Sequence, residues 1–133
     1  MAVRGVRGAN VAIEDRPEAI LQATQELLQA ILDANPTLKP QDIASAFFTV
    51  TSDLSSAYPA QAARQMGWQH VPLMCSTEIP VPDSLAHCIR ILLHWNTELP
   101  QEEIHHVYLG EAKRLRPDLF TGEEGFAIPR RTN

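Results

Sequence analysis

Residues 88–95 read CIRILLHW, the most strand-like run in the chain. Alternate side chains of a strand point to opposite faces, so Ile89, Ile91 and Leu93 share one face and Arg90 lies on the other. The first face is apolar and predicts a core. The second face carries a guanidinium on a very apolar element, and burying a cation costs several kcal/mol unless it is paired. We therefore expect an anionic group to face Arg90, either a protein carboxylate or a ligand.

The rest of the chain predicts an α/β (α+β) fold, a mixed β-sheet with helices packed on one face. Further strands are expected at residues 3–11, 43–51, 71–75 and 105–109, the second of which could also end a short helix. Expected helices are a long one from an Asp15 N-cap to Asn35-Pro36, and short ones at 60–66 and 111–115. One sheet face stays uncovered in such a layer, and association of several copies would cover it.

Composition is that of an ordinary globular chain with a single domain. Of its 133 residues, 44% are hydrophobic and 20% charged, and the formal net charge is -5. The absence of a basic run argues against nucleic-acid binding, because phosphate contacts need clustered Lys and Arg. No stretch approaches the roughly eighteen apolar residues of a membrane span, and the first residues lack an apolar signal core. The prediction is a cytoplasmic protein, with an organelle stroma as the alternative.

The cysteines and histidines predict neither a disulfide nor a metal site. Cys75 and Cys88 both fall inside strand-like runs, which is typical of reduced packing residues. The five histidines show neither the i, i+4 pairing of a helix nor a Cys partner at zinc-ligand spacing. No metal and no cofactor is therefore expected.

Four arginines, one carboxylate and one phenol stand in separate elements as candidate binding groups: Arg7, Arg64, Arg90, Arg116, Glu78 and Tyr108. If they converge, they suit a small polycarboxylate, because Arg binds carboxylates through two parallel hydrogen bonds and Tyr adds a neutral donor. No Ser-His-Asp arrangement or Gly-rich phosphate loop is present, which disfavours nucleophilic and phosphoryl-transfer chemistry. The alternative is a set of scattered surface ion pairs.

Five motifs stand in order along the chain: RGVRGA (4–9), YPAQAAR (58–64), GWQHVP (67–72), CIR (88–90) and HVYL (106–109) leading to LRPDL (115–119). Together they resemble the AroH class of chorismate mutases, the monofunctional trimeric enzymes. The resemblance covers residues 1–119, and we expect 120–133 to be a mobile tail. It implies a homotrimer of pseudo-α/β-barrel character, with a site in each cleft between neighbouring subunits.

Carried over by position, the resemblance divides the site between two subunits. One subunit would supply Arg7, Glu78, Arg90 and Tyr108, with Leu115 and Arg116 closing the cleft. The neighbouring subunit would supply Tyr58, Ala60, Arg64, Leu73, Met74 and Cys75. Three positions depart from the family pattern, since Tyr58 replaces a usual Phe, Gln61 stands where some members carry Lys, and Met74 where some have Thr.

The implied reaction converts chorismate to prephenate by a Claisen rearrangement, a step of phenylalanine and tyrosine biosynthesis. Arg90 would donate to the ether oxygen as negative charge grows there, an oxyanion-hole role. Glu78 would accept from the ring hydroxyl, and Arg7 and Tyr108 would hold a carboxylate. Cys75 would lie near the hydroxyl, or would be a small buried packing residue.

A second function remains open, a trimeric regulatory module that binds a small carboxylate without turnover. Arginines in a cleft look the same in both cases. Glu78 discriminates between them, because a carboxylate facing an anionic ligand weakens binding and is useful mainly when it stabilises a transition state.

Overall fold

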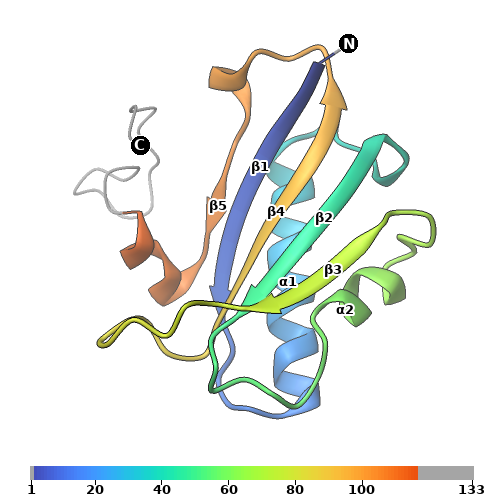
Figure 1. Ribbon diagram of the computed structural model, residues 1–133. Helices are drawn as coiled ribbons and strands as arrows, with labels where there is room; N and C mark the ends of the chain where they lie inside the picture. Colours follow the sequence, from blue (N-terminus) through green and yellow to red (C-terminus); the bar gives the residue numbers. More distant parts are fainter. Residues whose placement is uncertain (1, 117–133) are drawn as a thin grey trace.

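A five-stranded mixed sheet in the order β3-β2-β4-β1-β5 forms the centre of the computed structural model, which describes residues 2–116 (Figure 1). The strands are β1 (Ala2–Val11), β2 (Ile43–Val50), β3 (Leu73–Thr77), β4 (Cys88–Thr97) and β5 (Val107–Tyr108). β4 pairs antiparallel with β1 and β2, while β3 joins β2 and β5 joins β1 in parallel. The predicted mixed sheet is confirmed, and its central strand is the CIRILLHW run. The expected tail at 120–133 lies outside the described residues.

The helices α1 (Pro17–Ala34) and α2 (Ala60–Gln65) lie on one face of the sheet, behind it in Figure 1. Three short 3₁₀ helices complete the described elements: η1 (Pro40–Asp42), η2 (Gln101–Glu103) and η3 (Gly110–Leu115). Pro17 suits the first turn of α1, where its missing N–H has no helical partner. Apolar residues at helical spacing then turn one side of α1 to the sheet, as the sequence predicts.

The apolar face of β4 is the centre of the core. Ile91, Leu93 and Trp95 are buried in one cluster with Leu27 and Ile31 of α1. Burying each such side chain contributes about 1.5–3 kcal/mol. The predicted division of this strand into a core face and a face bearing Arg90 is therefore confirmed.

Asp15 was expected to cap α1, and this is wrong. The N-cap residue is Arg16, which makes no side-chain capping bond. The Asp15 carboxylate instead accepts the backbone N–H groups of Ser55 (2.9 Å) and Ser56 (3.1 Å), which offer it donors from the loop after β2. Asp15 therefore joins two loops rather than closing a helix.

Two strands differ from their expected bounds. β3 begins at Leu73 rather than residue 71, because Pro72 has no N–H to give to a ladder. β5 covers two residues instead of the five expected at 105–109. The backbone leaves the sheet at its end, where Gly110 adopts a positive φ of 51° and η3 begins in place of an α-helix.

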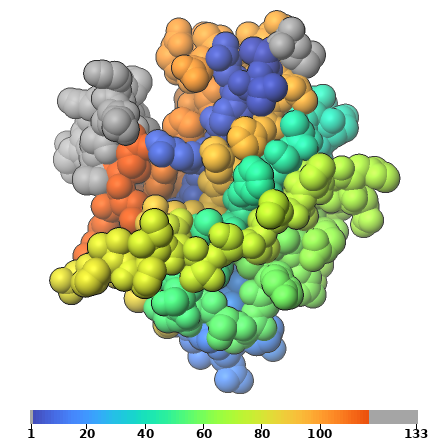
Figure 2. All heavy atoms as spheres, in the orientation of Figure 1, coloured from blue at the N-terminus to red at the C-terminus, as the bar shows by residue number. Residues whose placement is uncertain are grey.

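The sheet face opposite α1, called the open face below, is only partly covered by the described residues. At one end of it, Ala112 of η3 packs with Ala9 and Tyr108. Figure 2 shows the other strands of this face at the molecular surface. Large apolar side chains exposed there include Phe47 (40%), Met74 (63%) and Leu92 (37%) on three neighbouring strands. Within residues 2–116, no helix is long and apolar enough to cross a membrane.

Candidate active site

The pairing register brings Arg90 and Tyr108 to the open face. Arg90 is paired with Ala9 of β1, and Ala9 is paired in turn with Tyr108 of β5. On its other side, Arg90 is paired with Thr49 of β2. Paired residues point to the same side of a sheet, so these four side chains form one row across the open face.

Glu78 is the anionic group that faces Arg90. It follows β3 directly, and its backbone N–H donates to the carbonyl of Val50 at 2.9 Å. Its Oε2 lies 3.7 Å from Arg90 Nε and accepts a hydrogen bond of 2.7 Å from the Thr49 hydroxyl. Of the two alternatives drawn from the sequence, the structure therefore supplies a protein carboxylate.

The pair between Arg90 and Glu78 leaves the guanidinium incompletely bonded. A separation of 3.7 Å is too long for a hydrogen bond. Arg90 Nε is shielded from solvent and makes no hydrogen bond with any residue in 2–116. A buried donor left without an acceptor costs about 1–3 kcal/mol. The Arg90 side chain as a whole is 40% exposed, so part of it is open to solvent although Nε is not.

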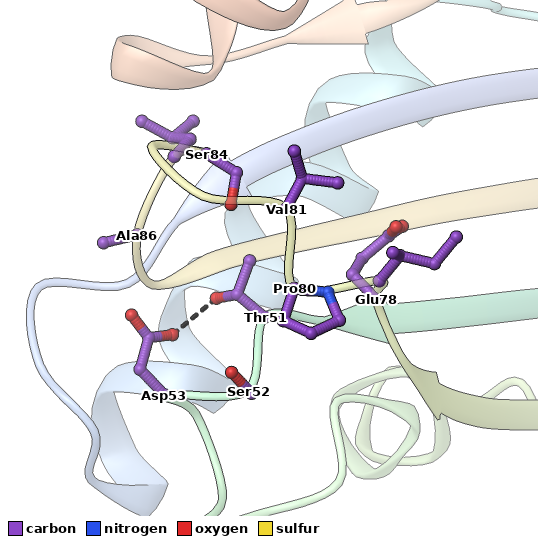
Figure 3. A pocket seen from close by; sticks show the side chains of 10 residues that line it. Thr51, Ser52, Asp53, Glu78, Pro80, Val81, Ser84 and Ala86 are labelled. Atoms are coloured by element: carbon purple, nitrogen blue, oxygen red, sulfur yellow. Dashed lines mark hydrogen bonds between the residues drawn. The ribbon is translucent and has the colours of Figure 1, made fainter.

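Glu78 also lines a hollow of about 200 Å³ (Figure 3). Its lining comes from the loop after β2 and the loop before β4, and it includes the polar side chains of Thr51, Asp53 and Ser84. Asp53 accepts from the Thr51 hydroxyl and from the backbone N–H of His87. Burial opposes ionisation of Asp53, but these hydrogen bonds prevail and lower its pKa. The two loops that border Glu78 are thus fastened to each other.

Arg7 lines a second hollow on the open face, of about 320 Å³. Arg7 is paired with Leu92, two residues along β4 from Arg90, so both guanidiniums belong to the same face. The rest of the wall comes from Gly5, Leu92, Gln101, Ile104 and His106. The structure therefore places Arg7 and Arg90 on one face, in neighbouring positions of the sheet.

Leu115 and Arg116 follow from η3 at the edge of the same face. Leu115 packs against the cluster that contains Ala9, Cys88 and Tyr108. Arg116 is the next residue and the last described one, and it is partly exposed. Burial raises the pKa of the Cys88 thiol despite the nearby Arg90 charge, which suits the packing role predicted for Cys88.

Most of the residues that we expected a neighbouring subunit to supply do not lie on the open face. Leu73 and Cys75 are paired with Ala46 and Phe48, and they pack against the main core on the α1 side. Ala60 is buried in that same core. Tyr58 is 71% exposed before α2, and Arg64 is exposed on it. Met74 alone of this set points to the open face, as the partner of Phe47. Within one chain, the candidate residues thus form two groups, one around Arg90 on the open face and one around α2.

Two polar residues near these groups were not anticipated from the sequence. Thr49 holds Glu78 through its hydroxyl, and His106 accepts the backbone N–H of Arg7 at 3.0 Å. Alternation along β2 could have put Thr49 on the polar face. Its position beside Arg90 depends on the register between strands, which the sequence does not print.

The chain matches the family model described as chorismate mutase type I over residues 3–119. Two relatives carry the name chorismate mutase AroH. The one from Thermus thermophilus is 56% identical over 88% of this chain and 96% of its own length, and the one from Bacillus subtilis is 43% identical over 90% and 94%. A solved chorismate mutase from Clostridium thermocellum superposes with a TM-score of 0.80 at 45% identity, covering 83% of this chain and 97% of that one. The chain therefore belongs to the chorismate mutase type I family.

Proposed function

We propose that this chain, as a chorismate mutase, converts chorismate to prephenate by electrostatic stabilisation of the transition state. No covalent intermediate and no proton transfer is needed. The observation that carries the proposal is the unbonded Nε of Arg90, on a partly exposed side chain beside a carboxylate. That pair presents one donor and one acceptor to a substrate that holds an ether oxygen and a ring hydroxyl.

Arg90 donates to the ether oxygen as the C–O bond breaks ahead of C–C bond formation. Negative charge then grows on that oxygen and the ring becomes electron-poor. Removing one such preorganised donor generally costs about 3 kcal/mol, roughly two orders of magnitude in rate. Glu78 accepts from the ring hydroxyl and offsets the positive charge of the ring, while Thr49 holds the carboxylate of Glu78 in place.

Arg7 and Tyr108 hold a substrate carboxylate and so select the compact conformer in which the reacting carbons are close. Both residues belong to the open face with Arg90. Leu115 and Arg116 close this half of the site from η3. The remaining contacts come from Tyr58, Ala60, Arg64, Leu73, Met74 and Cys75 of a neighbouring chain.

The assembly we propose is a homotrimer with one site at each junction between chains. The separation of the candidate residues into two groups supports it, because one chain alone does not bring Arg64 to Arg90. Exposed Phe47, Met74 and Leu92 support it as well. A contiguous apolar patch on a sheet face marks a surface that another chain covers. We further propose a cytoplasmic location, since Cys75 and Cys88 are free thiols.

Loss of chorismate absorbance on mixing with purified protein tests the reaction directly. We expect saturable loss, with a rate constant that is flat across neutral pH and unchanged in D₂O because no proton moves. A bell-shaped profile centred near neutrality would contradict the mechanism. Chorismate that binds in calorimetry while its absorbance persists would favour a carboxylate-binding regulatory module instead.

A further inference from the structure

The backbone N–H of Arg7 lies on the β5 side of β1, at a point beyond the two residues with which β5 pairs. Polar backbone groups of successive strand residues point to opposite edges. The carbonyl of Ala9 accepts from Leu109 at 3.0 Å, so the groups of Ala9, and those of Arg7 two residues away, face β5. β5 is paired only with Gly8 and Ala9. The N–H of Arg7 therefore lies just past the end of this ladder.

The imidazole of His106 occupies that position. Its Nδ1 accepts the N–H of Arg7 at 3.0 Å, where a longer β5 would have offered a carbonyl. An Nδ1 that accepts a hydrogen bond carries no proton, so the ring is the neutral form with its hydrogen on Nε2. Protonation would place an N–H against an N–H and break the contact.

We propose that neutral His106 is a positioning residue for Arg7. The inference rests on the proposed function, in which the Arg7 guanidinium holds a substrate carboxylate. The side chains of both residues line the same hollow of about 320 Å³. On the β5 edge, the imidazole takes the place of a strand partner for Arg7, so losing it frees the backbone from which the guanidinium extends.

The surroundings of His106 keep it neutral at ordinary pH. Burial is the main cause that lowers its pKa, and repulsion from His105 adds to it. Arg7 of β1 is the charged group that lines the hollow with it, while β4 and η2 contribute the uncharged Leu92 and Gln101. A cation beside His106 also favours the neutral ring. Protonation, and with it release of Arg7, is therefore expected only below the ordinary histidine pKa of about 6.5.

Two substitutions separate the hydrogen bond from the bulk of the ring. His106→Ala removes the acceptor, and we expect KM for chorismate to rise about fivefold with kcat within about twofold. The reason is that Arg7 holds the carboxylate in the substrate and in the transition state alike. His106→Asn places an amide oxygen near the position of Nδ1, and we expect it to restore KM. A fall in kcat at unchanged KM, or no rescue by Asn, would overturn the proposal.

The pH profile separates positioning from a merely structural role. We expect kcat/KM of the wild-type enzyme to be flat above about pH 6.5 and to fall below it as His106 becomes protonated. In His106→Asn, the fall of kcat/KM that is due to protonation of His106 should disappear. In His105→Ala the fall should begin at higher pH, because one cause of the lowered pKa is gone. An acidic limb that is the same in all three proteins would contradict the inference.

Nuclear magnetic resonance checks the contact without relying on catalysis. A ¹⁵N–¹⁵N coupling through the hydrogen bond is expected between the Arg7 amide and His106 Nδ1, and the Arg7 amide signal should follow the titration of His106. Absence of both would overturn the assignment. An enzyme that fails to convert chorismate yet shows this coupling would refute the proposed function while leaving the contact intact.

Discussion

Arg90 has a buried Nε donor without a hydrogen-bond acceptor, and it lies at ion-pair distance from the carboxylate of Glu78. Glu78 keeps the guanidinium in place electrostatically, but at 3.7 Å it does not use up the Nε donor. Thr49 contributes to this spacing by binding the same oxygen, Oε2, that is nearest to Arg90. In the mechanism that we propose, the Arg90 guanidinium donates to the oxygen atom that becomes negative during the reaction.

Arg90→Lys tests the planar fork of the guanidinium. An ammonium is a single point charge and cannot keep Glu78 and bind the ether oxygen with the same geometry. We expect kcat to fall at least about 100-fold, measured by chorismate absorbance. Arg114→Lys is the matched control, because Arg114 lies on the exposed side of η3 and pairs only with Glu111 among the described residues. Retention of most activity in Arg90→Lys would show that another group serves the ether oxygen.

Thr49→Val tests whether the orientation of Glu78 matters. Valine keeps the shape of the side chain and suits a strand, but it removes the donor to Oε2. Hydrogen bonds to charged groups contribute about 1.5–3 kcal/mol, so we expect kcat to fall roughly tenfold with little change in melting temperature. Thr37→Val, on an exposed turn after α1, is the control. Equal kinetics for the two variants would remove Thr49 from the site.

At the scale of elements, side-chain hydrogen bonds hold together the loops that connect the strands and helices. The Asp15 carboxylate, in the turn between β1 and α1, receives four side-chain and backbone hydrogen bonds from Ser55 and Ser56. This turn thereby fastens the loop that leads to Tyr58. Those bonds, of which the Ser56 hydroxyl contributes most, lower the pKa of Asp15 below 3.8.

Asp15→Asn should loosen this loop in a way that depends on pH. A carboxylate with a lowered folded pKa contributes stability that is present above the unfolded pKa and is lost as pH falls through the folded one. We expect the wild type, but less so the variant, to lose stability below about pH 4 in urea titrations. Amides of Ser55 and Ser56 should also exchange faster in the variant. Glu14→Gln, one residue earlier and exposed, should change neither measurement.

The strands could be predicted because their alternation of apolar and polar residues is local. The site could be predicted only in part, because it assembles residues that are far apart in the sequence. Alternation alone gave the two faces of β4, and the bounds of β1 and α1 followed from composition and Pro17. Pairing of Arg90 with Thr49 and Ala9 depends on register, which no short pattern encodes. β5 ends before Gly110, which has a positive φ, and His106 binds the backbone of Arg7 through its side chain. Neither feature could be read from local periodicity.

At the scale of the whole molecule, the two groups of candidate residues predict that catalysis needs more than one chain. Co-expression of Arg90→Lys and Arg64→Ala chains with different tags, followed by purification on both tags, isolates mixed assemblies, which are trimers in the arrangement that we propose. Around such a ring, a chain with Arg90 meets a neighbour with Arg64 once. We therefore expect about one third of wild-type activity, although each variant alone is nearly inactive.

A second mixture distinguishes shared sites from simple stabilisation of one variant by the other. Arg90 and Glu78 lie 3.7 Å apart in one chain, so both belong to the same half of a site. Mixed trimers of Arg90→Lys and Glu78→Gln chains contain no junction with both residues intact, and we expect them to stay inactive. Activity in this mixture would show that the two variants stabilise each other rather than share a site. No activity in the Arg90→Lys and Arg64→Ala mixture would place the whole site within one chain. The open face with Phe47, Met74 and Leu92 would then be covered for a reason unconnected with catalysis.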